Sequence, residues 1–450
     1  MASDDLTLLI LAAGKGTRMR SDRPKVLHPL GGQPLIAHVL DAGAALSARG
    51  AVAVLAPDSA EIGPYLEKAP YPIRVAIQDP PLGTGHAVRC ALDLLPGHGT
   101  ALIVYGDTPL MRPQTLLDLV QARVAADAAV AVLGMRPPET QGYGRLAFDN
   151  GELVAIVEAR HADPVLLRVG LCNSGVMAVD ASRLRELVEA LEVHADRNEY
   201  YLTEIVALAH QRGWRCTATE GPWEDGIGIN SQVQLAEAET ILQNRLRRVA
   251  LDNGVIMRAP DTVHLSVDTR LAAGCEIEPY VVFGPGVTVG EGACIHSFSY
   301  LERSDVRNGA QVGPFARLRP GARIHEGAKV GNFVEIKNAD ILAGTKVSHL
   351  SYVGDAAVGP RANVGAGTIT CNYDGFGKFR TEIGEDASIG ANSSLVAPVR
   401  IGNGAMTAAG STITSDVEDD ALGHSRTEQQ TVPQAAARFR AKRAAGKRNP

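Results

Sequence analysis

The stretch VVFGPGVTVGEGACIHSFSYL, residues 281–301, places a large apolar residue at every sixth position, at Phe283, Val289, Ile295 and Leu301. A period of six fits neither an α-helix nor an ordinary alternating β-strand. It predicts the hexapeptide coils of a parallel β-helix, in which one apolar residue per flat face points into the core. Such stacks of repeats form rigid, one-dimensional columns.

The same repeat runs through most of the C-terminal half, with three single-residue slips of phase and one interruption. Its further apolar positions are Ile277, Val306, Val312, Leu318, Ile324, Val330, Ile336, Ile341, Val347, Val353, Val358, Val364, Ile383, Ile389, Leu395, Ile401 and Ile413, with Thr407 in place of one of them. Glycine often follows directly, which we interpret as relief at the corner of a coil. The interruption, TCNYDGFGKFRTE at 370–382, predicts a loop expelled from the stack, and such loops are usually functional.

The composition is that of an ordinary soluble globular protein. The chain has 450 residues, 45% hydrophobic and 21% charged, with a formal net charge of -6. The length predicts two or three domains, and the charge gives no reason to expect a nucleic-acid partner. One basic run, residues 438–448, is interpreted as a solvated, partly disordered tail.

Neither the cysteines nor the apolar segments indicate export or a membrane. The six cysteines are scattered and form no CxxC pair, which predicts free thiols in a reducing cytoplasm and no zinc or disulfide framework. The apolar segment 6–13 is too short to span a bilayer and follows two aspartates, so it predicts a buried strand.

The first 230 or so residues alternate short apolar runs with helical spacing. Strands are predicted at 8–11, 51–55, 101–104, 129–133 and 176–179, and helices at 35–46 and 115–124. This alternation favours a Rossmann-like α/β domain with a mostly parallel sheet, in which ligands bind beyond the carboxyl ends of the strands. We therefore divide the chain into this domain (1–232), a helical linker arm (233–253) and the β-helix with its tail (254–450).

A glycine-rich segment, LAAGKGTRM at 11–19, follows the first predicted strand, and PKVL follows at 24–27. Gly14 would let the backbone approach a phosphate, while Arg18 and Lys25 add positive charge. The spacing matches neither the dinucleotide fingerprint nor the Walker pattern. Asp107 follows another strand in YGD, where it would either ligate Mg²⁺ or cap the next helix.

Taken in order, these motifs and LGTGHA (82–87), GYGR (142–145), IVE (156–158) and CNSG (172–175) resemble the sugar-nucleotide pyrophosphorylases. With the β-helix attached, residues 8–426 resemble the family of bacterial bifunctional N-acetylglucosamine-1-phosphate uridyltransferases and glucosamine-1-phosphate acetyltransferases. The resemblance implies a cytoplasmic, left-handed β-helical homotrimer with acetyltransferase sites between subunits. It also implies a route to UDP-N-acetylglucosamine for peptidoglycan and lipopolysaccharide.

For uridylyl transfer from UTP to N-acetylglucosamine-1-phosphate, the resemblance implies one role for each matched residue. Leu11, Ala12 and Gly14 would meet the uracil and ribose, Gln78, Gly83 and Thr84 would read the base, and Lys25 would contact the phosphates. Arg18 would act catalytically on the triphosphate, and Tyr105 would line the pocket. Gly144, Glu158 and Asn173 would hold the sugar, and Asp107 with Asn230 would ligate Mg²⁺.

For acetylation of glucosamine-1-phosphate by acetyl-coenzyme A, the resemblance makes His349 the general base. Arg319 and Lys337 would clamp the sugar phosphate, and Tyr352, Asn363 and Asn372 would hold the sugar. Asn372 and Tyr373 would reach the coenzyme from the expelled loop, and Ala366, Ala391, Ala409 and Arg426 would line its channel. The family often has Ser at the position of Ala391, so a hydroxyl contact there would be lost.

Two alternatives stay open on the residues alone. In the first, the β-helix is a non-catalytic assembly or regulatory scaffold beside a working nucleotidyltransferase. In the second, the β-helix is a metal-dependent hydrase of the carbonic anhydrase type. The hydrase needs three convergent histidines, and His296, His325 and His349 include no close pair. The choice between Mg²⁺ and Mn²⁺ and the role of the basic tail also stay open.

Overall fold

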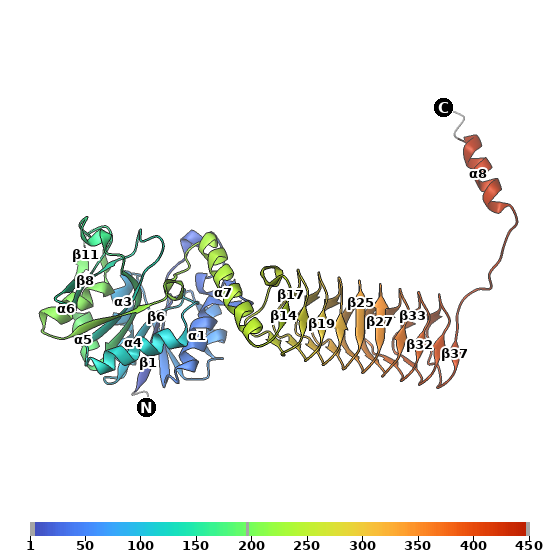
Figure 1. Ribbon diagram of the computed structural model, residues 1–450, viewed down its shortest axis with the longest axis horizontal. Coiled ribbons are helices and arrows are strands. Elements are labelled where there is room, and N and C mark those ends of the chain that lie inside the picture. Colours follow the sequence, from blue (N-terminus) through green and yellow to red (C-terminus); the bar gives the residue numbers. More distant parts are fainter. Residues whose placement is uncertain (1–4, 195–197, 447–450) are drawn as a thin grey trace. The chain divides into compact units, whose positions relative to one another are not determined.

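The computed structural model describes residues 5–194 and 198–446, and the chain divides into two compact units, Met1–Arg248 and Val249–Pro450 (Figure 1). The helical segment predicted between the two domains is helix α7 (Gln232–Asp252), and the division falls within its last turn. Two residues of the predicted basic tail, Lys447 and Arg448, lie outside the described residues.

The first unit is built on a mostly parallel sheet, as predicted. Its order is β13-β7-β10-β6-β1-β4-β5, with β8 paired to β10 and β9 paired to β8. Its strands are β1 (Leu6–Leu11), β4 (Gly50–Leu55), β5 (Ile73–Ile77), β6 (Thr100–Tyr105), β7 (Val130–Met135), β8 (Arg145–Asp149), β9 (Glu152–Val157), β10 (Cys172–Asp180) and β13 (Cys216–Gly221). Strand β10 runs antiparallel to β6 and β7.

Helices cover both faces of this sheet. On one face, helices α1 (Leu35–Ala45) and α4 (Pro113–Ala125) belong to the same core cluster as Leu8 and Ile10. On the other face, helices α3 (Gly83–Ala91), α5 (Ala181–Glu189) and α6 (Ile205–Gln211) belong to the same core cluster as Leu9 and Leu11. Strand β1 is therefore buried on both sides, which explains its run of apolar residues from Leu8 to Leu11. Shorter elements are α2 (Gly63–Leu66), β2 (Pro29–Leu30), β3 (Gln33–Pro34), β11 (Val193–His194) and β12 (Glu199–Tyr200).

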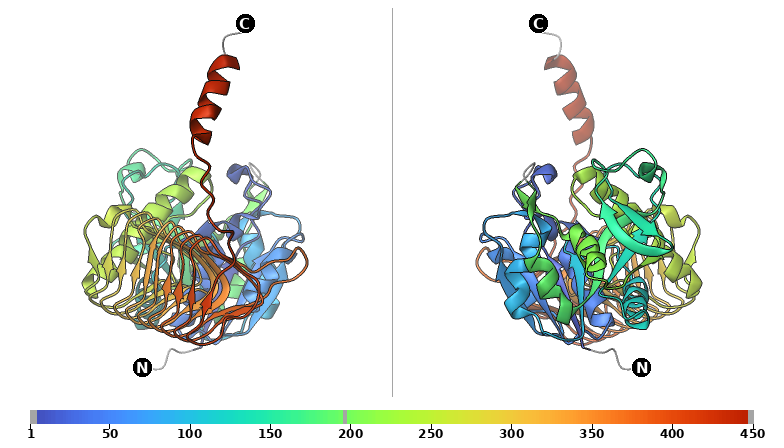
Figure 2. Two further views of the ribbon diagram at one scale, coloured as in Figure 1. Left: turned by 90° about the vertical axis from the view of Figure 1, so that its right-hand side faces the viewer. Right: turned by 90° about the vertical axis from the view of Figure 1, so that its left-hand side faces the viewer.

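The second unit is a parallel β-helix of hexapeptide repeats. One sheet contains β14 (Ile256–Met257), β16 (Glu276–Ile277), β19 (Cys294–Ile295), β22 (Gln311–Val312), β25 (Lys329–Asn332), β27 (Lys346–His349), β29 (Asn363–Val364), β32 (Ser388–Ile389), β35 (Met406–Thr407) and β37 (Leu422–Gly423). We call it the ten-stranded sheet. Each of its strands pairs in parallel with its counterpart on the next coil, and Figure 2 looks along the resulting stack.

The other strands of the column form the fourteen-stranded sheet. They are β15 (Arg270–Leu271), β17 (Val282–Phe283), β18 (Thr288–Val289), β20 (Tyr300–Leu301), β21 (Asp305–Val306), β23 (Arg317–Leu318), β24 (Arg323–Ile324), β26 (Glu335–Ile341), β28 (Tyr352–Val358), β30 (Ile369–Cys371), β31 (Thr381–Ile383), β33 (Ser394–Val396), β34 (Val399–Ile401) and β36 (Thr412–Ile413).

The hexad positions predicted from the sequence form the core of the column. Every one of these apolar residues is buried. At two positions of the repeat a threonine replaces the apolar residue, and these threonines, Thr370 and Thr407, are buried as well. The glycines that follow serve the packing between coils. A Cβ at Gly365 would lie 2.6 Å from the backbone nitrogen of Ala391 on the next coil, too close for any side chain.

The predicted expelled loop leaves the stack between β30 and β31. Its turn is closed by Asp374, whose carboxylate accepts hydrogen bonds from the backbone N–H groups of Phe376 and Gly377 at 2.8 and 2.7 Å. Partners on neighbouring coils are usually 17 or 18 residues apart, as in the Arg323–Asp340 and Asp268–Gly286 pairs. Across the loop this separation becomes 25, as between Arg361 and Asp386.

The basic tail differs in part from the prediction. Residues 427–445 are exposed, as expected, but Ala435–Gly446 form a helix, α8, that was not predicted. All six cysteines are free thiols, which confirms the prediction. Among the described residues, no helix has the length and apolar character needed to cross a membrane.

Candidate active sites

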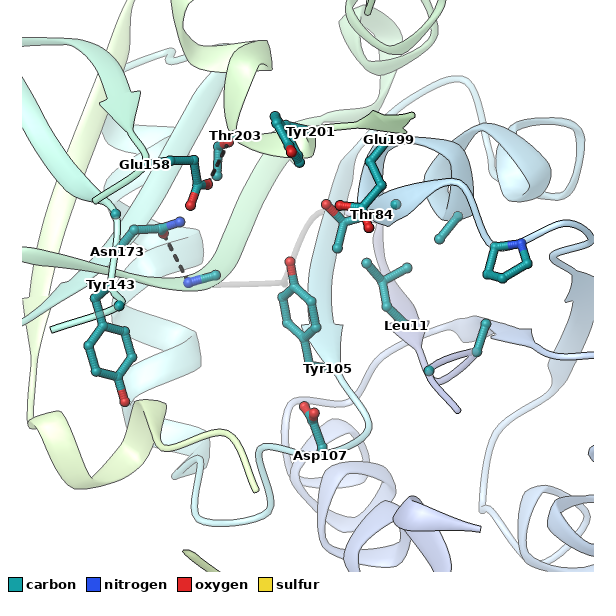
Figure 3. A pocket seen from close by; sticks show the side chains of 18 of the residues that line it. Leu11, Thr84, Tyr105, Asp107, Tyr143, Glu158, Asn173, Glu199, Tyr201 and Thr203 are labelled. Carbon is teal, nitrogen blue, oxygen red and sulfur yellow. Dashed lines mark hydrogen bonds between the residues drawn. The ribbon is translucent and has the colours of Figure 1, made fainter. Parts of the chain in front are cut away.

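A cavity of about 870 Å³ opens at the carboxyl ends of β1 and β6 in the first unit (Figure 3). This is the edge at which a doubly wound sheet binds its ligands. Twelve of the residues predicted for uridylyl transfer line it: Leu11, Gly14, Arg18, Lys25, Gln78, Gly83, Thr84, Tyr105, Asp107, Gly144, Glu158 and Asn173. The motifs are scattered over the sequence, and the fold brings them to one place.

The cationic end of the cavity is organised by Lys25. Its ammonium group forms a short ion pair with the Asp107 carboxylate and donates a second hydrogen bond, of 3.1 Å, to Oδ1 of Asn230. Both side chains of the ion pair are largely buried, with 10% and 15% exposed. The Lys25 ammonium group thus lies between Asp107 and Asn230, the two residues that are predicted to ligate Mg²⁺.

The backbone keeps Asn230 beside Asp107. The N–H of Ile229 donates to the carbonyl of Asp107 at 2.9 Å, and the N–H of Asn230 donates to the side chain of Gln234 on α7 at 2.8 Å. Asn230 therefore belongs to the site although it lies behind Lys25 rather than on the cavity surface. Ala12 also lies behind the wall, with 8% of its surface exposed, and its N–H donates to Val54.

At the opposite side, the start of α3 meets the segment around Tyr200. Gly83 has a φ of +90°, and a Cβ there would lie 2.8 Å from the carbonyl oxygen of Tyr200, so the position requires glycine. The Gln78 amide donates to the carbonyl of Gly83 at 2.9 Å. This fixes the first turn of α3, which carries Thr84 into the cavity.

Tyr105 lies in the middle of the cavity wall, between Asp107 and Glu158 (Figure 3). Burial raises the pKa of its phenol, and the charges of Asp107 and Glu158 raise it further. Tyr105 is therefore a neutral hydrogen-bonding group at physiological pH.

The end of the cavity lined by Glu158 and Asn173 contains residues that the sequence analysis missed. Oγ1 of Thr203 donates to the Glu158 carboxylate at 3.2 Å, and Oδ1 of Asn173 accepts from the N–H of Gly175 at 2.9 Å. Thr203 belongs to a segment far from IVE in the sequence. The further lining residues that were not predicted are Ala13, Lys15, Pro81, Ala87, Gly142, Tyr143, Ala159, Arg160, Ser174, Gly175, Glu199, Tyr201 and Thr203.

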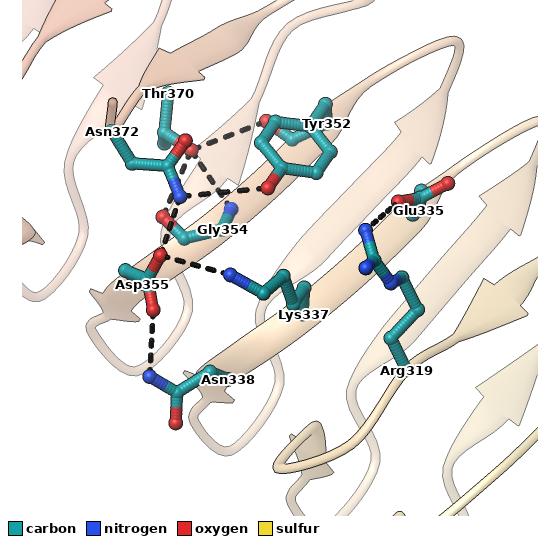
Figure 4. A network of polar contacts seen from close by, with 9 residues as sticks. All are labelled: Arg319, Glu335, Lys337, Asn338, Tyr352, Gly354, Asp355, Thr370 and Asn372. Atoms are coloured by element: carbon teal, nitrogen blue, oxygen red, sulfur yellow. Dashed lines mark hydrogen bonds and ion pairs between the residues drawn. The ribbon is translucent and has the colours of Figure 1, made fainter. Parts of the chain in front are cut away.

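In the β-helix, several predicted residues meet in a network on the fourteen-stranded sheet (Figure 4). At its centre the Asp355 carboxylate accepts from Nζ of Lys337 at 3.3 Å, from Asn338 at 2.7 Å and from Asn372 by a short bond. Burial opposes the charge of Asp355, but these donors together hold its pKa below the usual range. Asp355 and Asn338 were not predicted.

The same network gathers positive charge. Arg319 donates to Glu335 at 2.9 Å, one strand from Lys337. Lys378 of the expelled loop lies close to Lys337, whose ammonium group lowers the pKa of Lys378. The Asn372 amide also donates to the Tyr352 hydroxyl at 3.4 Å. Three cations and two neutral donors thus surround one patch, which suits a phosphate group.

His349 lies on the other sheet, at the end of β27. Its side chain is exposed and faces away from the core, as a catalytic base requires. Nδ1 lies 2.5 Å from Oδ1 of Asn332, the residue paired with it on β25. An amide oxygen accepts hydrogen bonds only, so Nδ1 donates in this bond, and in a neutral imidazole the lone pair is then on Nε2.

The residues predicted for the coenzyme channel follow His349 along one corner of the column. The carbonyl of His349 accepts from the N–H of Gly367, that of Ala366 from Asn392, and that of Ala391 from Gly410, each on the next coil. The Arg426 guanidinium donates to the carbonyl of Ala409 at 3.1 Å. The four channel residues are thus aligned on consecutive coils.

Not all the predicted residues meet within one chain. Asn363 pairs with Lys346 on the ten-stranded sheet, apart from Tyr352. Tyr373 is 62% exposed on the expelled loop, where its hydroxyl donates to Gly375. Among the described residues, no hydrogen bond or ion pair joins His349 to the Asp355 network.

Comparisons with known proteins identify two kinds of domain in the chain. Residues 8–195 match the MobA-like NTP transferase domain, and residues 268–303 and 380–415 match the bacterial transferase hexapeptide repeats. Curated relatives named bifunctional protein GlmU are similar over nearly their whole length. Those of Paramagnetospirillum magneticum, Jannaschia sp. and Azorhizobium caulinodans are 50%, 49% and 49% identical, covering 99%, 97% and 98% of this chain and 99%, 96% and 99% of the relatives.

Proposed function

Because this chain belongs to the family of bifunctional GlmU proteins and is both a uridyltransferase and an acetyltransferase, we propose that each compact unit carries one of the two reactions. The β-helix acetylates glucosamine-1-phosphate with acetyl-coenzyme A. The first unit then transfers UMP from UTP to N-acetylglucosamine-1-phosphate. The observation that carries the proposal is the convergence of the uridylyl-transfer residues on one cavity, while the acetyl-transfer residues lie in the other unit.

In uridylyl transfer, an oxygen of the sugar phosphate attacks the α-phosphorus of UTP. The new P–O bond forms as the bond to the β-phosphate breaks, and pyrophosphate leaves. The attacking oxygen is already anionic, so the chain needs no general base. Glu158 and Asn173 hold the sugar, and the cationic side chains of Arg18 and Lys25 stabilise the charge on the phosphates.

The metal implied by the family fits the residues present. Asp107 and Asn230 both turn oxygen atoms towards the Lys25 ammonium group, and carboxylate and amide oxygens are ligands that Mg²⁺ accepts. When bound, the divalent cation would neutralise charge on the phosphates. Lys25 would then be free to turn from Asp107 to a phosphate.

In acetyl transfer, Nε2 of His349 removes a proton from the amino group of the substrate as that nitrogen attacks the thioester carbonyl. The C–N bond forms, the C–S bond breaks, and the coenzyme leaves as a thiol after taking up a proton. Arg319, Lys337 and Lys378 hold the sugar phosphate. The channel lined by Ala366, Ala391 and Ala409 leads the coenzyme to His349, and Arg426 contacts its phosphates.

The acetyltransferase site is completed by a neighbouring subunit in a homotrimer. His349 and the Asp355 network lie on different sheets of the column. This supports a shared site, because a site between two subunits can bring together residues from different faces of the column. The cation-rich network also argues against a β-helix that acts only as a scaffold, because a scaffold has no use for converging lysines.

One assay tests both halves of the proposal. The full-length protein is incubated with glucosamine-1-phosphate, acetyl-coenzyme A, UTP and Mg²⁺, and free thiol and pyrophosphate are followed together. We expect thiol release to precede pyrophosphate release. Without acetyl-coenzyme A neither product should appear, and N-acetylglucosamine-1-phosphate should then restore pyrophosphate alone. Pyrophosphate release without thiol release from the complete mixture would contradict the proposed division.

A further inference from the structure

Three metal-binding side chains converge at the first coils of the β-helix, in the half of the column that precedes the acetyltransferase residues. Glu278, Cys294 and His296 each offer one ligand atom, and these atoms all lie within 4.8 Å of one another. They are the one group of three or more such residues found at this spacing in the described part of the chain.

The β-helix fixes these side chains on adjacent strands. Glu276 and Ile277 of β16 pair with Cys294 and Ile295 of β19. Ile277 and Ile295 point into the core, so Cys294 and His296, which flank Ile295 at the end of β19, project outwards. Glu278 follows Ile277 and lies beside His296 on the preceding coil.

The separations of the ligand atoms are close to those around a coordinated cation. Nδ1 of His296 lies 3.1 Å from Oε1 of Glu278 and 3.7 Å from Sγ of Cys294. Around a tetrahedral Zn²⁺, with bonds of about 2.0–2.3 Å, neighbouring nitrogen, oxygen and sulfur ligands lie about 3.3–3.6 Å apart. A cation could therefore enter with small side-chain adjustments.

A second set of contacts holds the carboxylate in place. The backbone N–H of Ser297 donates to Oε2 of Glu278 at 3.0 Å, and the Ser297 hydroxyl lies 3.3 Å from the same atom. The bond from the Ser297 N–H lowers the pKa of Glu278, so this ligand is anionic at neutral pH. Outer contacts of this kind orient the ligands of metal sites.

The thiol is the ligand that a cation would change most. Burial, and after it the carboxylates of Glu278 and Glu276, raise the pKa of Cys294 to about 11 against the opposing charge of Arg258. The free protein therefore holds a thiol here. A bound divalent cation favours the thiolate, and the proton passes to solvent.

We propose that Glu278, Cys294 and His296 form a binding site for a thiophilic divalent cation of the Zn²⁺ class, with a fourth position open to water. One carboxylate, one thiolate and one imidazole are the ligand types that Zn²⁺ accepts. The cation links two neighbouring coils and reinforces the start of the column. The sequence analysis missed the site because Glu278 lies a full coil before the Cys-Ile-His segment.

Cobalt titration of the full-length, chelator-treated protein tests this site. Co²⁺ bound by a thiolate gives charge-transfer absorption in the near ultraviolet, whereas Co²⁺ held by oxygen ligands at Asp107 does not. We expect this absorption in the wild type, its loss on adding Zn²⁺, and its absence in Cys294→Ser. Glu278→Gln and His296→Gln should weaken Co²⁺ binding by about 10-fold or more.

Cys90→Ser is the matched control, because Cys90 also lies 3.8 Å from a histidine nitrogen, that of His86, without a third ligand. It should keep the absorption. Zn²⁺ should also raise the melting temperature of the wild type but not of Cys294→Ser. The same spectrum in the wild type and Cys294→Ser, or no thiolate absorption in the wild type, would overturn the proposal. Neither result bears on the two transferase activities.

Discussion

Nδ1 of His349 and Oδ1 of Asn332 lie 2.5 Å apart, and the two residues are paired on the adjacent strands β27 and β25. Nδ1 donates in this hydrogen bond, so Nε2 is the basic nitrogen of the neutral imidazole. Asn332 is therefore a positioning residue for the proposed base. It touches the imidazole rather than the substrate.

Asn332→Ala should lower kcat for acetyl transfer by about 10- to 100-fold, the usual effect of losing a group that orients a functional histidine. The loss should be smaller than that of His349→Ala. Asn332→Asp keeps an acceptor oxygen and should restore most of the rate. Its negative charge should also move the pH profile of kcat to higher pH, because it stabilises the imidazolium. If Asn332→Ala acetylated the substrate with the kcat of the wild type, Asn332 would have no positioning role.

The bond from Thr203 to Glu158 predicts a specific effect on sugar binding. Thr203→Val removes the donor and leaves the shape of the side chain, so the KM for N-acetylglucosamine-1-phosphate should rise by about 10-fold. The KM for UTP should stay near its wild-type value. Thr203→Ser, which keeps the hydroxyl, is the control. Equal increases in both KM values would show that Thr203 supports the whole cavity instead.

Lys378 of the expelled loop should contribute to phosphate binding in acetyl transfer. Lys378→Ala should raise the KM for glucosamine-1-phosphate by about 10-fold, as expected for a charged hydrogen bond, and added salt should reduce the difference from wild type. Lys329→Ala changes an exposed lysine on the ten-stranded sheet and should leave this KM unchanged. The same KM in both variants would remove Lys378 from the phosphate clamp.

An ion pair on the outside of the column predicts a pH-dependent stability. Asp340 accepts two hydrogen bonds from Arg323, at 2.5 and 2.8 Å, and this pairing with Arg323 lowers its pKa. A carboxyl group with a lower pKa in the folded state stabilises the protein above its unfolded pKa of about 3.9, and the contribution disappears as pH falls through the folded value.

Asp340→Asn should therefore lower the melting temperature at pH 7, by the equivalent of about 1 kcal/mol or less because Arg323 is half exposed. The difference from wild type should shrink as the pH is lowered below 4. Thermal melts from pH 7 to pH 3 measure it. A difference that grows towards low pH would contradict the stated direction of the pKa shift.

The sequence predicted the column well because its period is set locally. Each hexapeptide places one side chain in the core, independently of the rest of the chain. Every predicted core position is buried. The period also predicts which residues lie side by side on neighbouring coils, and the sequence analysis did not use this. Neighbouring coils are 17 or 18 residues apart, so counting back from His349 leads to Asn332, and counting forward from Lys337 leads to Asp355.

Other parts could not be found in this way. Thr203 reaches Glu158 from 45 residues away, through the packing of segments with no shared period. Lys378 lies in the loop that breaks the repeat, so its approach to Lys337 follows from the path of that loop. In the first unit, β5 was missed because it is an edge strand in which Val75 and Ile77 are about half exposed.

The most direct test of two independent sites is to measure both activities in Asp107→Asn and His349→Ala, after circular dichroism has shown that each variant is folded. Asp107→Asn should lose Mg²⁺-dependent uridylyl transfer and keep wild-type acetyl transfer. His349→Ala should lose acetyl transfer by about 10²- to 10⁴-fold and keep wild-type uridylyl transfer. Comparable loss of both activities from either single substitution in folded protein would contradict the account.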